Sequence, residues 1–89
     1  LGLPAPGPIP TAVTIGIDTP DAMAAEAARL AAVPLLKVKL DCEAVRERLE
    51  AVRSAAPAPR LIVDPNESWT VEMVAAHGPL LRELNCDLL

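Results

Sequence analysis

Residues 35–40 read LLKVKL, an alternation that puts Lys37 and Lys39 on one side and Leu36, Val38 and Leu40 on the other. Such a period of two predicts a β-strand with one apolar and one charged face. Helices cover the apolar face of a strand in a strand–helix–strand unit, and a doubly wound sheet would bury the lysine face as well. The pair therefore favours a (β/α)8 barrel, whose active sites lie at the carboxyl ends of the strands.

The same alternation leaves another interpretation open, an edge strand whose outer face is blunted by exposed lysines. Inside a barrel, the two ammonium groups would lie roughly 7 Å apart, because they are two residues apart on one face. Each would disfavour the charge of the other, which makes the pair a candidate for acid/base chemistry.

The sequence before this strand predicts a strand followed by a helix. Residues 11–18 (TAVTIGID) are β-branched and alternating, which is typical of a strand. Thr19 suits the N-cap of a helix and Pro20 its first turn, and the alanine-rich run that follows favours a helix as far as Pro34.

After the lysine strand, Asp41 is expected to cap a second helix that ends before Pro57. Its apolar positions follow the helical repeat and the others are mostly charged, so one stripe should face a sheet, formed by Val45, Leu49 and Val52. Residues 60–64 (RLIVD) predict a third strand.

A third helical region should extend to residue 84, with a kink or restart at Gly78 and Pro79, because proline lacks the backbone N–H donor. Asn85 suits a left-handed stop, and residues 86–89 begin a fourth strand. Alternating strands and helices with short connections predict a parallel sheet.

The predicted organisation is a linker over residues 1–10, with four prolines and two glycines, followed by the amino-terminal part of a barrel over residues 11–89. This is an α/β fold with about three and a half βα units, where a full barrel takes about 250 residues. We therefore expect the chain to be part of something larger, preceded by another domain.

Composition excludes several classes of protein. The net charge of −4 leaves no basic face for nucleic acid, and no apolar run is long enough for a membrane span, so we expect a cytoplasmic protein.

Cys42 and Cys86 do not have metal-site spacing with His77, and both are expected to be reduced, packed thiols. His77 is expected to be solvated, and Trp69 to anchor its helix on the barrel.

Asp64 ends the third strand and is followed by Pro65, Asn66, Glu67 and Ser68, a run rich in oxygen-bearing side chains. Hard cations such as Mg²⁺ prefer oxygen ligands of this kind. The alternative is an ordinary turn with a helix cap. Thr14 should share the lysine face on the first strand, with either a substrate contact or a packing role.

The strings LLKVKLD (35–41), RLEAVRSAAP (48–57) and LIVDPNESW (61–69), with TAVTIGIDTPDAMA (11–24), together resemble the enolase superfamily. Within it they are most similar to the muconate-lactonizing-like subgroup and its L-Ala-D/L-Glu (dipeptide) epimerases. This resemblance implies a Mg²⁺-dependent isomerase that moves the proton on the carbon alpha to a carboxylate.

The resemblance also implies roles for individual residues. Lys39 corresponds to the acid/base catalyst, and Lys37 to the neighbouring lysine that stabilises the enolate oxygen. Asp64 corresponds to a Mg²⁺ ligand, and Asn66 to the asparagine beside the metal that orients neighbouring groups. Pro65 departs from the family, which usually has alanine there, and proline fixes φ and removes a backbone N–H donor in this loop.

The rest of the family's site should lie outside the chain. The next metal ligand, a glutamate, is expected just beyond Leu89, with the third ligand and the opposing lysine further on, and a capping domain before the linker. A dipeptide is the expected substrate, and a homo-oligomer or the remainder of the same polypeptide the expected partner.

Alternatives remain at this stage. Muconate cycloisomerase, succinylbenzoate synthase and acylamino acid racemase share the same motifs. A different class is a non-catalytic, truncated segment that associates through its open sheet edges. On its own, the 89-residue chain is expected to be inactive, because three and a half units cannot close a barrel.

Overall fold

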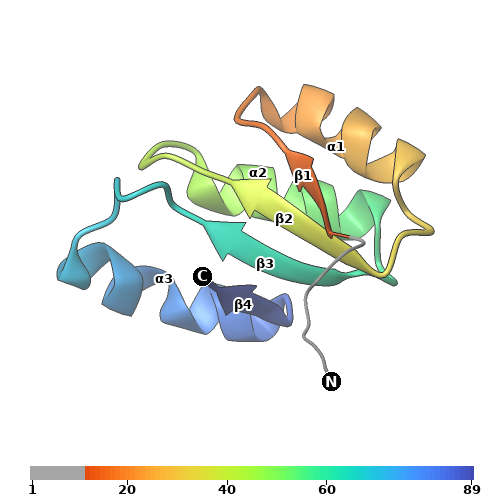
Figure 1. Cartoon of the computed structure of the whole chain (residues 1–89). Coiled ribbons are helices and arrows are strands. Elements are labelled where there is room, and N and C mark those ends of the chain that lie inside the picture. Colours follow the sequence, from red (N-terminus) through yellow and green to blue (C-terminus); the bar gives the residue numbers. More distant parts are fainter. Residues whose placement is uncertain (1–11) are drawn as a thin grey trace, which may run out of the picture.

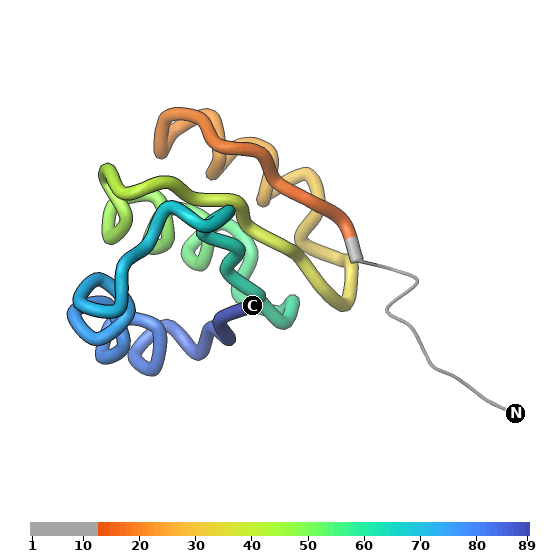
Figure 2. Tube along the Cα trace, turned by 60° about the vertical axis from the view of Figure 1, so that its left-hand side comes forward, coloured from red at the N-terminus to blue at the C-terminus, as the bar shows by residue number. Residues whose placement is uncertain are grey.

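A computed structural model describes residues 12–89, so the predicted linker over residues 1–10 lies outside the described residues. Strands and helices alternate along this part of the chain (Figure 1): β1 (Ala12–Ile15), α1 (Pro20–Arg29), β2 (Leu35–Lys39), α2 (Val45–Ala55), β3 (Arg60–Asp64), α3 (Val71–Glu83) and β4 (Cys86–Leu88). The strands form a parallel sheet, as predicted, and their order in the sheet is β1-β2-β3-β4. Figure 2 follows the chain from β1 to β4, with a helix between successive strands.

The core lies on one face of this sheet. Strand residues and helix residues form a single buried cluster, which includes Ile15, Leu36, Val38, Leu40, Leu61, Val63 and Cys86 from the strands and their extensions, and Met23, Ala27, Val45, Leu49, Val52, Leu80 and Leu81 from the helices. Because α1, α2 and α3 all contribute to it, the three helices of the described part cover the same face. A doubly wound sheet would have helices on both faces, so the one-sided arrangement supports the predicted wall of a barrel.

The two ends of α1 differ in how well they were predicted. Thr19 is the N-cap, its Oγ1 accepts a hydrogen bond from the N–H of Ala22 (3.2 Å), and Pro20 opens the helix as predicted. The helix ends at Arg29, well before Pro34, because the N–H of Leu30 bonds to carbonyls of the preceding turn and closes it. The prediction that Pro34 ends this helix is therefore wrong.

The strand predicted over residues 11–18 is also too long, since β1 ends at Ile15. Ile17 is 42% exposed and belongs to the connection to α1. The Asp18 carboxylate accepts a hydrogen bond from the N–H of Thr19 (2.7 Å), which turns the chain toward the helix. A local turn therefore takes precedence over the strand pattern.

The apolar stripe of α2 is confirmed, since Val45, Leu49 and Val52 are all buried. Its predicted cap is wrong, because the N-cap is Ala44, a left-handed residue with φ 52°. Asp41 instead accepts a hydrogen bond from the N–H of Glu43 (2.9 Å) and closes a turn ahead of the helix.

α3 runs through Gly78 and Pro79 as one helix, so the predicted restart does not occur. Leu80 and Leu81 follow directly and are buried, and their packing offsets the backbone hydrogen bond that proline removes. Asn85 has the predicted left-handed conformation, with φ 57°, and the chain then enters β4.

Both cysteines are free, as predicted. Cys86 is buried in the core, and burial raises the pKa of its thiol. Cys42 is exposed, so its predicted packing is wrong. None of the helices in residues 12–89 has the length and apolar character needed to cross a membrane.

Candidate active site

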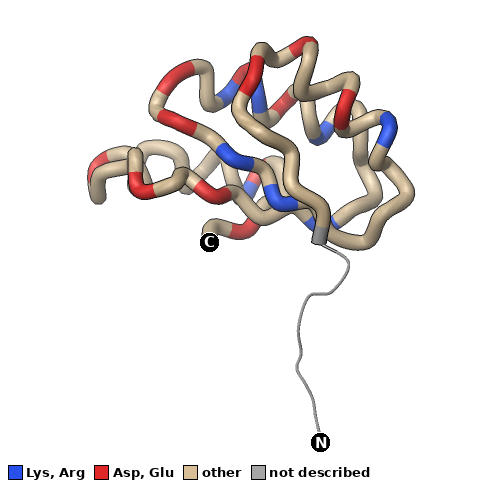
Figure 3. Tube along the Cα trace, turned by 45° about the horizontal axis from the view of Figure 1, so that its top comes forward, with Lys and Arg blue, Asp and Glu red and all other residues tan. Residues whose placement is uncertain are grey.

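The two lysines lie on a central strand of the described sheet. β2 pairs with β1 on one side and with β3 on the other, so the edge-strand interpretation of the LLKVKL pattern is wrong. Leu36, Val38 and Leu40 are fully buried against the helices, whereas Lys37 and Lys39 are partly exposed on the opposite face. Figure 3 marks Lys and Arg in blue and Asp and Glu in red along the backbone of the described residues.

The register of the strands assembles the predicted residues on this open face. Thr14 on β1 is the partner of Lys37, and Lys39 is the partner of Asp64 at the end of β3. Thr14 is exposed, so a role in packing the described core is not supported. The described sheet thus brings Thr14, both lysines and Asp64 onto one surface, toward the carboxyl ends of the strands.

Asp64 and Lys37 form an ion pair across this surface, with 3.4 Å between Nζ and Oδ2. The side chain of Asp64 is 15% exposed and that of Lys37 is 36% exposed. The other carboxylate oxygen, Oδ1, accepts a hydrogen bond from the backbone N–H of Asn66 (2.9 Å). That hydrogen bond is the main reason why the pKa of Asp64 lies below its usual value, and Lys37 and Lys39 lower it further against the effect of burial.

This lowered pKa gives the first prediction. Because the pKa of Asp64 is depressed in the fold, its charged form contributes stability above the unfolded pKa of about 3.9, and this stability is lost as pH falls through the folded pKa. Titration of the Asp64 carboxyl carbon by NMR, in the full polypeptide and without metal, should show a pKa below the usual value for an aspartate. Lys37→Met should raise that pKa only in part, since the N–H of Asn66 remains. A pKa at or above the usual value would contradict the geometry.

The segment after Asp64 is a turn, as the alternative reading of DPNES predicts. Asn66 and Glu67 have left-handed conformations, with φ of 54° and 65°, and the N–H of Ser68 donates to the carbonyl of Pro65 (2.9 Å). Ser68 does not cap α3, because Thr70 is the N-cap. This turn is compatible with a role of Asp64 as a metal ligand, because the N–H of Asn66 in the turn holds the Asp64 carboxylate in place.

Asp64 is suited to be one ligand of a magnesium ion. The described residues do not supply a complete set of ligands. Its carboxylate is an oxygen ligand of the type that Mg²⁺ prefers, and it lies at the carboxyl end of a strand. Within residues 12–89, no three His, Cys, Asp or Glu side chains cluster in a way that suits a metal ion. Asn66 is exposed beside Asp64. Any such metal would need ligands in addition to those described.

A second ion pair, not predicted from the sequence, lies on the same face. Arg60 begins β3 and its Nε lies 2.8 Å from Oδ2 of Asp87 on β4. The alternation in RLIVD places Arg60 on the same face as Asp64, and this signal was available in the sequence. The pair lies at the start of β3, and Asp64 lies at its end.

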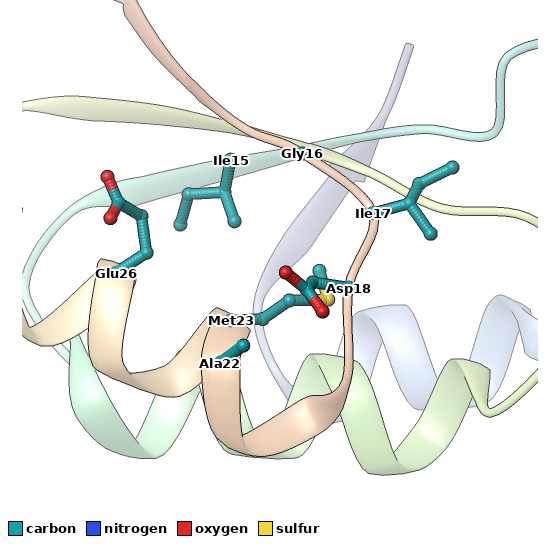
Figure 4. Close-up of a pocket in the computed structure, with 7 residues that line it drawn as sticks. All are labelled: Ile15, Gly16, Ile17, Asp18, Ala22, Met23 and Glu26. Carbon is teal, nitrogen blue, oxygen red and sulfur yellow. The ribbon is translucent and has the colours of Figure 1, made fainter.

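A pocket of about 230 Å³ lies elsewhere, between the end of β1 and the first turns of α1 (Figure 4). Its lining includes none of the predicted site residues and consists of Ile15, Gly16, Ile17, Asp18, Ala22, Met23 and Glu26. Asp18 and Glu26 are its only charged residues, so it has no cation to bind a carboxylate substrate. The lysine face remains the candidate site.

The chain is similar to known enzymes in sequence and in fold. The chain is 46% identical over 91 aligned residues to an L-Ala-D/L-Glu epimerase of Escherichia coli K12, with 100% of the chain and 28% of that protein covered. A solved structure of an L-Ala-D/L-Glu epimerase matches 85% of the chain with a TM-score of 0.80 and 50% identity, covering 24% of its own length. The resemblance to the enolase superfamily is confirmed.

Two further proteins are similar to the chain. An N-acetyl-D-glutamate racemase of Pseudoalteromonas is 38% identical over 76 residues, covering 85% of the chain and 24% of that protein. An enolase family member from Agrobacterium tumefaciens, solved with sodium and L-Ala-L-Glu, has a TM-score of 0.78 at 42% identity and covers 85% of the chain and 23% of its own length. The chain thus spans about a quarter of the length of these relatives. No family model matches it.

The sequence and fold of the described residues are therefore those of a segment of an enolase-superfamily barrel. Trp69 was predicted to anchor its helix, but it lies before α3, whose N-cap is Thr70. It packs against the core, and its indole N–H donates to the carbonyl of Asp41 (2.9 Å). His77 is only partly exposed and lies against Trp69, with 5.0 Å between ring centroids, which differs from the solvated position predicted for it.

Proposed function

We propose that the polypeptide containing this chain is a Mg²⁺-dependent dipeptide epimerase of the L-Ala-D/L-Glu type, which inverts the carbon alpha to a carboxylate. The observation that carries the proposal is the pairing of a central lysine strand with an aspartate at the end of the next strand: Lys39 is the register partner of Asp64, and Lys37 forms an ion pair with it. The relatives named as epimerases and racemases support the reaction class.

In this proposal Lys39 is the acid/base group on one face of the substrate. Its amine takes the α-proton, and the electron pair of the broken C–H bond moves into the substrate carboxylate to give an enolate. Lys37 supplies a positive charge on the same face that stabilises the enolate oxygen. Return of a proton from the opposite face inverts the centre, and that proton must come from a group outside residues 12–89.

Asp64 would hold the metal, with Asn66 beside it. When bound there, a divalent cation would supply positive charge that makes the α-proton easier to remove. The N–H of Asn66 fixes one oxygen of Asp64, and Lys37 compensates its charge in the described structure. We assign a substrate contact to Thr14, which is exposed on the same face and is the register partner of Lys37.

A second candidate is racemisation of N-acylated amino acids, which the similarity to an N-acetyl-D-glutamate racemase favours. Both substrates have a carboxylate next to the reacting carbon and an amide on its nitrogen, so the described residues suit either. The remaining parts of the polypeptide would distinguish the two.

The test is an activity assay of the full polypeptide with Mg²⁺, using L-Ala-D-Glu, L-Ala-L-Glu and both enantiomers of N-acetylglutamate. We expect interconversion of the dipeptides with a higher kcat/KM than that for the acylated amino acids. The reverse order would favour the racemase, and no turnover of any of the four would contradict both functions.

A further inference from the structure

The two loops at the carboxyl ends of β2 and β3 are joined by a single side chain. Trp69, which follows the turn after Asp64, donates its indole N–H to the backbone carbonyl of Asp41, 2.9 Å away. Asp41 follows the strand that carries the two lysines. The bond therefore links the loop after the lysine strand to the segment after the aspartate strand.

The Asp41 end of this link is braced. Its carboxylate accepts hydrogen bonds from the N–H of Glu43 (2.9 Å) and from the guanidinium of Arg48 (2.7 Å). Arg48 also donates to the carbonyl of Glu43 (2.9 Å), and its side chain is 14% exposed. The carbonyl that receives the indole N–H therefore belongs to a loop held by a mostly buried arginine.

The Trp69 end is fixed by packing. Its ring packs against the buried core and lies 5.0 Å from the ring of His77 on α3. Between Asp64 and Trp69 the backbone has two left-handed residues, Asn66 and Glu67. Such conformations cost roughly 1 kcal/mol or more each outside glycine, and they persist where the surrounding structure holds both ends of the segment.

We propose that Trp69 is a positioning residue for the turn over residues 65–68. Its bond to Asp41 fixes the far end of the turn, and thereby keeps the N–H of Asn66 on the Asp64 carboxylate that faces Lys37. The effect on turnover rests on the proposed function, whereas the effect on the turn itself does not.

Trp69→Phe in the full polypeptide tests this link, because phenylalanine keeps an aromatic ring for packing and removes the donor. Hydrogen–deuterium exchange of the Asn66 and Ser68 amides should become roughly fivefold faster relative to β3 amides, the effect of one lost neutral hydrogen bond. The kcat should fall by a similar factor with little change in KM. Val52→Ala, a core change on α2, is the control: it should lower the melting temperature without a selective change in the turn.

Arg48→Met provides a second variant, since it removes the hydrogen bonds from Arg48 to the Asp41 carboxylate and the Glu43 carbonyl and leaves Trp69 intact. It should speed exchange in the same turn. If neither variant changes exchange at residues 66 and 68, the link does not position the turn and the inference is overturned. If exchange is faster in the variants but the wild-type polypeptide shows no activity, the link is supported and the proposed function is contradicted. If the wild-type polypeptide is active and the variants exchange faster with an unchanged kcat, the catalytic part of the inference is overturned.

Discussion

Lys39→Ala is expected to abolish epimerisation by the full polypeptide, a loss of roughly a thousandfold or more, because it removes the proposed proton carrier. The fold should be retained, since Val38 and Leu40 on either side are fully buried and Lys39 lies on the open face. Turnover of L-Ala-D-Glu and the melting temperature would be measured on the same preparation. Substantial turnover by this variant would show that Lys39 is not the proton carrier.

Arg60→Ala is the matched control for this variant. Arg60 also lies on the face of the sheet opposite the helices, on the neighbouring strand, but at the start of β3 and paired with Asp87. It should leave kcat within about twofold of the wild type, because exposed ion pairs contribute little to stability. An equal loss in both variants would show that any change of charge on this face disturbs activity.

Asp64→Asn is expected to weaken Mg²⁺ binding and turnover together. The asparagine side chain still accepts the N–H of Asn66, so the turn should survive, whereas the anionic ligand is lost. Changing groups that only orient a ligand costs about 10- to 100-fold in metal affinity, so loss of the ligand itself should cost at least about a hundredfold. Calorimetric titration with Mg²⁺ in the full polypeptide measures this directly.

Asp87→Asn is the control for the metal. Asp87 is another carboxylate on the same face, and its partner is Arg60. Its loss should leave Mg²⁺ affinity unchanged. An unchanged affinity in Asp64→Asn would mean that Asp64 only holds the turn through Asn66.

The strand–helix order was predictable because residue spacing determines it. The alternation in LLKVKL and RLIVD corresponds to the buried and open faces of β2 and β3, and the Val45 stripe faces the sheet. The predicted ends of two elements were wrong because local hydrogen bonds form there. The Asp41 carboxylate accepts a hydrogen bond from the N–H of Glu43 instead of capping α2, and the Asp18 carboxylate accepts one from the N–H of Thr19, which turns the chain after β1. Such bonds depend on backbone geometry that periodicity does not contain.

The candidate site was partly predictable for the same reason. The alternation in LLKVKL indicated Lys37 and Lys39, the end of RLIVD indicated Asp64, and the family resemblance supplied their roles. The register brings the three residues together. The alternation in RLIVD indicates the face on which Arg60 lies, but not its partner. The ion pair between Arg60 and Asp87 and the bond from Trp69 to Asp41 join residues 27 and 28 positions apart, so no local pattern indicates these pairings. Their partners follow only from the packing of successive βα units.

Exchange of the substrate's α-hydrogen in deuterated water, catalysed by Lys39→Ala, tests the central claim that Lys39 acts on one face of the substrate. If it does, the full-length variant should still exchange the α-hydrogen of one dipeptide epimer, whose hydrogen faces the opposing base, without inverting it. The other epimer should show no exchange. Equal exchange of L-Ala-D-Glu and L-Ala-L-Glu, or inversion of either, would contradict the assignment of Lys39 and with it the proposed reaction on this face of the sheet.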